Sequence, residues 1–288
     1  MSRHEDRLWV GSMPEAYDRW LAPAVFRPFA ADLAERAARL NPDRVLEIAA
    51  GTGVLTAELV AALPEADVTA TDLNAAMVEF GSRQAPGATW RQADALNLSF
   101  DDGEFDLVTC QFGVMFFPDK PAAFREMRRV LRPGGTVLFN TWATIDTHGF
   151  AAALLAGIER TFPDDPPTFL VAVPHGYPDL DQVVADLAAA GLVSVSARTV
   201  TLEGQAESVA GVGTGFCTGT PLRTGIESRG DLAASTALIS EEMTNLLGPG
   251  PVTAQMTAHV IEAAASALPP APPGAPERER RRAVACIV

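Results

Sequence analysis

The sequence is poor in cysteine and contains no long apolar run. Its 288 residues include three cysteines, Cys110, Cys217 and Cys286, and their wide separation excludes a disulfide framework and a CxxC metal clip. No stretch of about 18 apolar residues is present, so we expect no membrane-spanning helix. The first twenty residues lack the apolar core of a secretory signal, and we therefore expect a cytoplasmic protein.

Basic residues are also scarce. The chain has 22 Lys and Arg against 36 Asp and Glu, which gives a net charge of -14 at pH 7. Acidic groups spread over the surface repel a phosphate backbone, so we expect no nucleic-acid partner. The one basic cluster, at 278–282, lies within residues 265–288, which begin proline-rich and end charged. We expect these residues to form a flexible tail outside the core.

The rest of the chain shows an alternation of predicted strands and helices. Apolar residues at three- and four-residue steps predict a helix over 14–40 and further helices over 179–190 and 230–247. Strands are predicted where segments alternate with helices, at 45–49, 68–72, 89–94, 105–112, 135–142, 193–202 and 252–264. The pattern is typical of an α/β fold, here a doubly wound, mostly parallel seven-stranded sheet with helices on both faces.

This alternation lapses after Trp142. We expect residues 1–264 to form a single domain, with residues 145–180 inserted over the carboxyl ends of the strands, where ligands bind in such folds. The insertion contains many apolar residues: Phe150, Leu154, Leu155, Phe162, Phe169, Leu170, Val173 and Tyr177. They predict either a hydrophobic pocket or the ordinary packing of a lid.

The segment VLEIAAGTGVLT indicates a cofactor site. An apolar strand turns through glycines at 51–53 into a helix, whose first N–H groups are free to bind a ligand. Asp72 ends the next strand, where a carboxylate can accept hydrogen bonds from both hydroxyls of a ribose. A dinucleotide fingerprint would have a small residue in place of Thr56, and Glu47 would repel a diphosphate. The loop therefore favours a nucleoside that carries a cationic amino group.

Four ordered segments resemble class I S-adenosylmethionine-dependent methyltransferases, in the branch of small-molecule and ubiquinone-type enzymes. The family's acid-x-Gly-x-Gly-x-Gly loop is matched by EIAAGTG, and its ribose-binding strand end by TDLNAAMVEF. Its adenine and fourth-strand region is matched by WRQADALNLSFDDGEFDLVTCQFGVMFF, and its fifth-strand region by FREMRRVLRPGGTVLFNTW. The resemblance implies transfer of a methyl group from S-adenosylmethionine to an O, N or C atom of a small, largely apolar molecule, with S-adenosylhomocysteine as product.

The resemblance also implies a role for each residue of the cofactor loop. Glu47 would face the methionine amino group, and the backbone of Gly51, Thr52 and Gly53 would pass along the aminoacyl and ribose parts. Ala49 stands where the family usually has its first glycine. We expect alanine to cost little there unless its φ is positive.

Further cofactor contacts are implied downstream. Leu73 and Met77 would pack on the adenine, with Asp94 and Ala95 at its edge. Core packing of the two apolar residues and a turn cap at Asp94 are the structural alternatives. Gln111 would lie near the methionine end.

Tyr17, in the leading helix, would close over the cofactor or simply pack as a core aromatic. A general base for the acceptor should lie above the carboxyl ends of the strands, which favours His148 and His175. His4 and His259 are interpreted as peripheral and structural, respectively. No cluster of acids and amides predicts a metal site, and the oligomeric state is left open.

Two other functions remain open at this point. A protein with this fold can catalyse a rearrangement or serve only as a binding partner, because fold does not fix chemistry. A nicotinamide-dependent dehydrogenase is the second alternative, since a glycine turn followed by an acidic strand end also occurs in NAD(P) sites.

Overall fold

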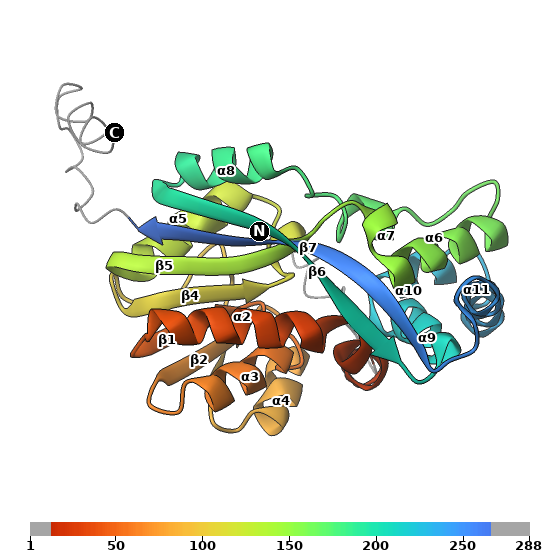
Figure 1. Ribbon diagram of the computed structural model, residues 1–288, viewed down its shortest axis with the longest axis horizontal. Helices are drawn as coiled ribbons and strands as arrows, with labels where there is room; N and C mark the ends of the chain where they lie inside the picture. Colours follow the sequence, from red (N-terminus) through yellow and green to blue (C-terminus); the bar gives the residue numbers. More distant parts are fainter. Residues whose placement is uncertain (1–12, 266–288) are drawn as a thin grey trace.

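The computed structural model describes residues 13–265, so His4 and the predicted tail beyond Ala265 lie outside the described residues. Its centre is a single seven-stranded sheet with the order β3-β2-β1-β4-β5-β7-β6 (Figure 1). The strands are β1 (Arg44–Ile48), β2 (Asp67–Asp72), β3 (Thr89–Gln92), β4 (Phe105–Gln111), β5 (Leu131–Trp142), β6 (Leu192–Ala206) and β7 (Val252–Ala265). Neighbouring strands among the first five are parallel, and β7 is antiparallel to β5 and β6. The predicted fold is confirmed.

Helices cover both faces of this sheet. The face toward the viewer in Figure 1 carries α2 (Arg27–Leu40), α3 (Val54–Ala62) and α4 (Ala75–Gln84), and the other carries α5 (Lys120–Val130) and α8 (Leu180–Ala189). Side chains alternate between the faces along each strand. Val45 and Leu107 pack in the cluster under α2 and α3, whereas Leu46 and Val108 pack in the cluster that contains α5 and α8.

The predicted helix over 14–40 is one continuous rod of three parts. It consists of α1 (Met13–Ala16), the π-helical η2 (Tyr17–Phe26) and α2. Pro23, which has no N–H to donate, lies inside η2. The rod ends at Asn41, whose φ of +47° is the left-handed conformation common at helix C-termini. The π-helical stretch is notable because such turns often lie at functional sites.

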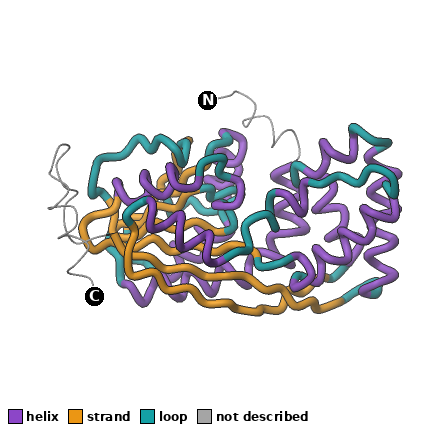
Figure 2. The backbone as a smooth tube through the Cα atoms, turned by 90° about the horizontal axis from the view of Figure 1, so that it is seen from above, coloured by secondary structure: helices purple, strands orange, loops and turns teal. Residues whose placement is uncertain are grey.

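A second lobe of helices lies beyond the carboxyl ends of the strands. It contains α6 (Gly149–Thr161), α7 (Phe169–Ala172), α9 (Val209–Gly219), α10 (Leu222–Glu227) and α11 (Leu232–Leu247). We call residues 145–178 and 209–247 the cap. Figure 2 shows long strands running from the sheet lobe to this lobe, and these are β6 and β7, which bracket the second segment. The cap therefore extends beyond the predicted insertion over 145–180.

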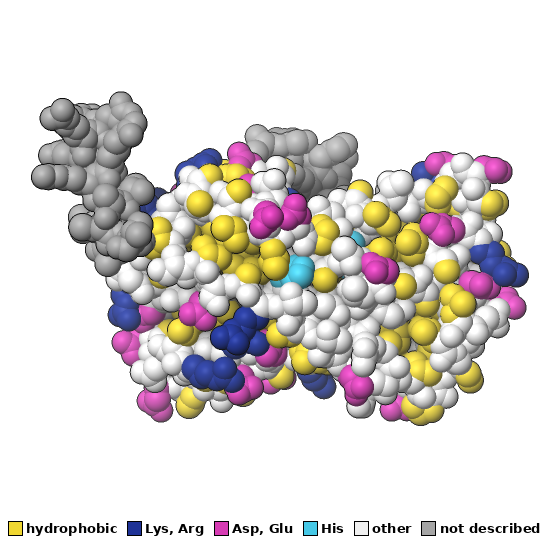
Figure 3. Space-filling view, turned by 45° about the horizontal axis from the view of Figure 1, so that its top comes forward, with side chains coloured by type: hydrophobic (Ala, Val, Ile, Leu, Met, Phe, Trp, Pro, Cys, Tyr) yellow, Lys and Arg dark blue, Asp and Glu magenta, His cyan; other side chains and the backbone are white. Residues whose placement is uncertain are grey.

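The described surface shows two further features. On the face in Figure 3, Lys and Arg side chains form small separate groups among acidic ones, with no continuous basic stripe there. Within residues 13–265, no helix is long and apolar enough to cross a membrane.

Candidate functional site

A cavity of about 380 Å³ lies where the strands of the parallel part end. Its floor is made by segments at the ends of β1 to β5, one wall by the N-terminal rod, and its roof by the cap. The lining is mainly apolar; its carboxyl and amide groups lie at the ends of β2 to β4, and two histidines line it from the cap. This is the position at which open α/β sheets bind ligands.

Glu47 is a buried carboxyl group beneath the glycine turn. It lies in β1 with 1% of its surface exposed, and its Oε2 accepts a hydrogen bond of 2.6 Å from the Thr56 hydroxyl. Burial raises the pKa of Glu47 to about 8, and the nearby carboxyl of Asp72 adds to the rise. Glu47 also lines a small hollow of about 40 Å³ together with Tyr17 and Gln111. A buried acid beside such a hollow fits a cationic amino group.

The glycine turn contains one strained residue. The φ angle is +56° at Ala49, +56° at Gly51 and +91° at Gly53. The positive φ is the exception stated for position 49, so alanine is costly there, because left-handed backbone costs a residue with a Cβ about 1–2 kcal/mol. Thr52, between the glycines, is buried, and it lines the small hollow with Ala49 and Gly51.

Replacing Ala49 by glycine is expected to raise the free energy of unfolding by about 1 kcal/mol. Glycine adopts a positive φ without strain, and its greater entropy in the unfolded chain offsets part of the gain. Urea denaturation measures the change. Ala50→Gly is the matched control, because Ala50 is not among the residues with positive φ and glycine there should destabilise the fold. Equal destabilisation by both variants would contradict the assignment of strain to Ala49.

Asp72 joins the ends of β1 and β2. Its Oδ2 accepts a hydrogen bond of 2.9 Å from the Gly51 N–H, and its Oδ1 accepts one of 2.9 Å from the Asn74 N–H. Asn74 in turn caps α4 by accepting from the N–H groups of Ala76 and Met77. The Asp72 side chain also lines the cavity, and burial raises its pKa. The carboxylate is therefore fixed in orientation before any ligand arrives.

The four residues expected near an adenine all line the cavity. Leu73 follows β2, Met77 lies in the first turn of α4, and Asp94 and Ala95 follow β3. The Asp94 Oδ1 accepts a hydrogen bond of 2.8 Å from the Leu96 N–H, so the turn cap exists as well. The structure brings this predicted set together at one end of the cavity.

Gln111 and Tyr17 connect the sheet to the N-terminal rod. The Gln111 Nε2 donates a hydrogen bond of 2.8 Å to the Phe26 carbonyl, across 85 residues of sequence. Tyr17 stacks on Phe26 with a distance of 4.8 Å between ring centroids, and burial raises the pKa of its hydroxyl. Both residues line the cavity, so the π-helical segment forms part of its wall.

The two candidate histidines lie close together in the cap. His148 precedes α6 and His175 follows α7, yet their ring centroids are 5.6 Å apart with an interplanar angle of 79°. Both line the cavity beside Trp142. Burial lowers the pKa of His148 to about 3 and also lowers that of His175. His259 lies in β7, where its Nδ1 is 2.9 Å from the Thr199 hydroxyl, in keeping with its structural interpretation.

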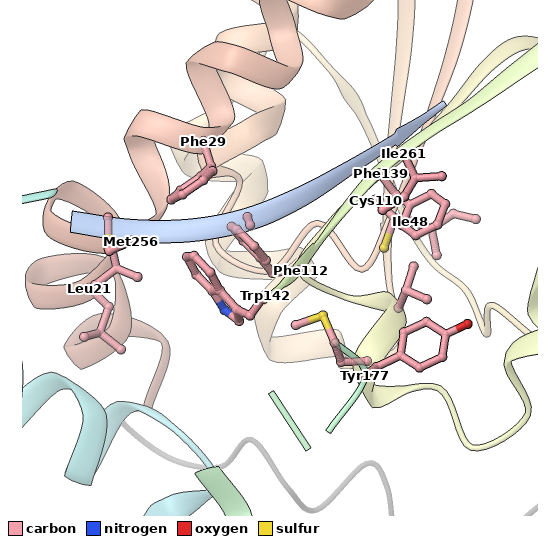
Figure 4. Packing of buried hydrophobic residues seen from close by; sticks show 14 of the residues in the cluster. Leu21, Phe29, Ile48, Cys110, Phe112, Phe139, Trp142, Tyr177, Met256 and Ile261 are labelled. Atoms are coloured by element: carbon pink, nitrogen blue, oxygen red, sulfur yellow. The ribbon is translucent and has the colours of Figure 1, made fainter. Parts of the chain in front are cut away.

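Aromatic residues form a part of the site that was not predicted from the sequence. Phe112 and Trp142 stack with ring centroids 3.7 Å apart, and Figure 4 shows them side by side. Phe112 has a φ of +50°, held by a hydrogen bond of 2.9 Å from its N–H to the Asn140 side chain. The only sequence signal was an aromatic residue at the end of each of two adjacent strands.

The apolar cap residues divide between cavity and core. Of the set predicted from the insertion, Phe169, Leu170 and Val173 line the cavity, whereas Phe150 and Leu154 are fully buried and are not among the lining residues. The second cap segment contributes three residues that were not predicted, Phe216, Thr220 and Pro221. Within residues 13–265, no group of three or more His, Cys, Asp or Glu side chains is arranged to hold a metal ion.

Comparisons with known proteins agree with this geometry. A family model described as "Methyltransferase domain" matches residues 45–135. The ubiquinone/menaquinone biosynthesis C-methyltransferase UbiE of Ectopseudomonas mendocina is 33% identical over 175 residues, 55% of this chain and 68% of that protein. A demethylmenaquinone methyltransferase of Mycolicibacterium gilvum is 34% identical over 211 residues, 70% of this chain and 82% of the relative.

Among solved structures, phosphoethanolamine N-methyltransferase 2 of Haemonchus contortus, crystallised with S-adenosylhomocysteine and phosphomonomethylethanolamine, has a TM-score of 0.56. It is 14% identical, and the match covers 88% of this chain and 57% of that one, so it supports the fold alone. The two sequence relatives are similar over more than two thirds of their own length. Together with the sheet order and the cavity, they show that this chain belongs to the class I S-adenosylmethionine-dependent methyltransferases, as an enzyme of the small-molecule branch.

Proposed function

We propose that this enzyme methylates a planar, largely apolar acceptor of the quinone type. The observation that carries the proposal is one cavity whose carboxyl and amide groups lie at the strand ends and whose other end, under the cap, is aromatic and apolar apart from Thr220 and two histidines. Flat aromatic side chains, among them Phe112, Trp142 and Phe169, line the apolar end and suit a flat ring. The names of the sequence relatives, which refer to ubiquinone and menaquinone, support the same class of acceptor.

S-Adenosylmethionine occupies the polar end in this proposal. The buried carboxyl of Glu47 takes its amino group, and the carboxylate of Asp72 accepts hydrogen bonds from the ribose. Leu73, Met77 and the Asp94–Ala95 turn surround the adenine. When bound, the cofactor supplies an electrophilic methyl group on its sulfonium. The residues of this chain hold the two reactants in line and exclude water.

The cap forms the acceptor chamber in this proposal. Its two segments pack together, since α6 of the first segment packs on α11 of the second. Of the titratable side chains that line the cavity within residues 13–265, only His148 and His175 come from the cap. We assign removal of the acceptor proton to this pair, because histidine is the side chain best suited to proton transfer near neutral pH.

Cytoplasmic location and the lack of a nucleic-acid partner also belong to the proposal. The two described cysteines, Cys110 and Cys217, are unpaired and buried, as in proteins of a reducing compartment. The net charge of -14 disfavours contact with a phosphate backbone.

Product analysis tests the proposed reaction. The full chain is incubated with S-adenosylmethionine and a set of naphthoquinols and phenols, and the products are examined by mass spectrometry. We expect a product heavier by one CH2 and an equal amount of S-adenosylhomocysteine. A product of unchanged mass would indicate a rearrangement instead. Calorimetry with NAD(P) in parallel should give no binding, and tight NAD(P) binding would favour the dehydrogenase alternative.

Asp72→Ala is expected to weaken S-adenosylmethionine binding about tenfold or more. The carboxylate loses its charge-assisted hydrogen bonds to the ribose, which contribute roughly 1.5–3 kcal/mol. Asp72→Asn is the companion variant, because one amide oxygen still accepts an N–H from Gly51 or Asn74. Calorimetry measures the affinity and circular dichroism checks the fold. Unchanged affinity in a folded alanine variant would contradict the role of Asp72.

A further inference from the structure

The two histidines of the cap hold their protons on opposite ring nitrogens. The His148 Nδ1 is 3.2 Å from the N–H of Ala151 and caps the start of α6. A backbone N–H can only donate, so this Nδ1 carries a lone pair. In the neutral ring the proton therefore resides on Nε2, and His148 presents an N–H donor on the other side of its ring.

His175 has the reverse arrangement. Its Nδ1 is 3.0 Å from the Ala143 carbonyl oxygen, which can only accept a hydrogen bond. The Nδ1 therefore carries the proton, and the Nε2 of the neutral ring is an acceptor. Burial lowers the pKa of both rings below the ordinary value of histidine, which keeps both neutral at pH 7.

Both free Nε2 atoms belong to rings that line the same cavity. The ring centroids are 5.6 Å apart, and each ring packs beside Trp142, with centroids 4.5 Å away for His148 and 6.1 Å away for His175. Within residues 13–265, neither Nε2 has a hydrogen-bond partner. Neither is among the buried polar atoms that lack a partner. One small molecule against Trp142 can therefore contact both.

We propose that His148 and His175 form a donor–acceptor pair that selects acceptors with one hydroxyl group and one further oxygen. The His175 Nε2 takes the hydroxyl proton, and the His148 Nε2–H donates a hydrogen bond to the other oxygen. This inference rests on the proposed function and narrows its substrate class to hydroxylated rings that also carry a carbonyl or a second oxygen.

The proton transfer is balanced within this pair. The O–H bond of the acceptor breaks and its electron pair stays on oxygen, while an N–H bond forms at the His175 Nε2, which becomes imidazolium. The electron pair makes the oxygen, or a conjugated ring carbon, nucleophilic toward the methyl group. The hydrogen bond from His148 stabilises negative charge that spreads to the second oxygen. The imidazolium returns its proton to water after product release.

Nitrogen-15 NMR of the full chain with labelled histidine tests the ring assignments directly, without any ligand. The chain has four histidines, and the loss of signals in His148→Asn and His175→Asn assigns two of them. Asparagine suits both positions, because its oxygen can cap α6 and its amide N–H can reach the Ala143 carbonyl. We expect His148 protonated at Nε2 and His175 protonated at Nδ1 at pH 7. The same tautomer at both residues would overturn the proposal.

Binding of two simple compounds tests the selectivity. 1-Naphthol offers a hydroxyl proton, whereas 1,4-naphthoquinone offers only acceptor oxygens. We expect His175→Asn to weaken naphthol binding about three- to tenfold with little change for the quinone. We expect His148→Asn to have the opposite effect, weakening quinone binding more than naphthol binding. The affinity for S-adenosylmethionine, measured in the same samples, should stay constant.

The outcomes separate this inference from the proposed function. If the ratio of the dissociation constants of 1-naphthol and 1,4-naphthoquinone moves in the same direction in both variants, the donor–acceptor pair is overturned and the planar acceptor class stays intact. A wild-type protein that binds S-adenosylmethionine but neither compound would overturn the acceptor class itself, and the pair with it.

Discussion

His175→Asn is expected to lower the turnover number roughly 10²- to 10⁴-fold, the usual contribution of a general base. The asparagine amide N–H can still reach the Ala143 carbonyl, to which the His175 Nδ1 is bonded, whereas the Nε2 of this cavity-lining ring is lost. The affinity for S-adenosylmethionine should not change, because this side chain lies on the cap side of the cavity. Single-turnover kinetics with saturating cofactor measure the effect and separate it from product release.

The pH profile provides the control for this prediction. Burial lowers the pKa of His175 below its ordinary value near 6.5, so the neutral form of the base predominates at pH 7. Ionisation of His175 should therefore cause no change in the wild-type turnover number between pH 7 and 9. His148→Asn should cost less, about tenfold, because it removes one hydrogen bond to developing charge. Wild-type turnover in both variants and in the double variant would show that proximity alone drives the reaction.

Glu47→Gln is expected to weaken S-adenosylmethionine binding about ten- to a hundredfold and at the same time to stabilise the fold at alkaline pH. The amide cannot neutralise a cationic amino group, and charge-assisted hydrogen bonds of this kind contribute roughly 1.5–3 kcal/mol. In the wild type, the pKa of about 8 means that Glu47 is mostly protonated at pH 7 in the free protein. Cofactor binding should then release up to one proton. Calorimetry in buffers of different ionisation enthalpy measures this release, and the variant should show none.

The direction of both pH dependences follows from the raised pKa. Apparent cofactor affinity should increase from pH 5.5 to 7.5, because less work is needed to ionise Glu47. Stability should decrease as pH rises from about 4.5 toward 8, because in this window the unfolded chain has lost a proton that the folded chain keeps. Above pH 8 the full cost, on the order of a few kcal/mol, is present in the wild type and absent in the glutamine variant.

Glu65→Gln is the matched control for the Glu47 variant. Glu65 is exposed in the loop before β2, so the same chemical change there should alter neither cofactor affinity nor the pH dependence of stability. Urea denaturation at pH 5, 7 and 9 compares the three proteins. A wild-type protein whose stability relative to Glu47→Gln is constant across these pH values would contradict the raised pKa of Glu47.

The cofactor half of the site was predictable from the sequence because its residues lie within short segments at fixed positions on strands and turns. Glu47 and Asp72 lie near the carboxyl ends of two adjacent parallel strands, and the turn at 51–53 follows the first of them, so the sheet necessarily brings these residues together. Leu73 follows Asp72 directly, and Met77 lies in the first turn of α4. The energetic cost at Ala49 was not predictable, because the sign of φ depends on how the turn fits between β1 and α3.

The acceptor half depended on contacts between distant parts of the chain. The sequence by itself determined the strand and helix pattern, the order of the cofactor motifs and the presence of an apolar insertion, because these follow from local periodicity and short-range turns. Only the tertiary structure decided that residues 209–247 join the cap and that Phe169 lines the cavity while Phe150 belongs to the core. It also decided that His148 and His175 meet with opposite nitrogens bound to backbone, since burial and ring orientation are set by packing across the whole fold.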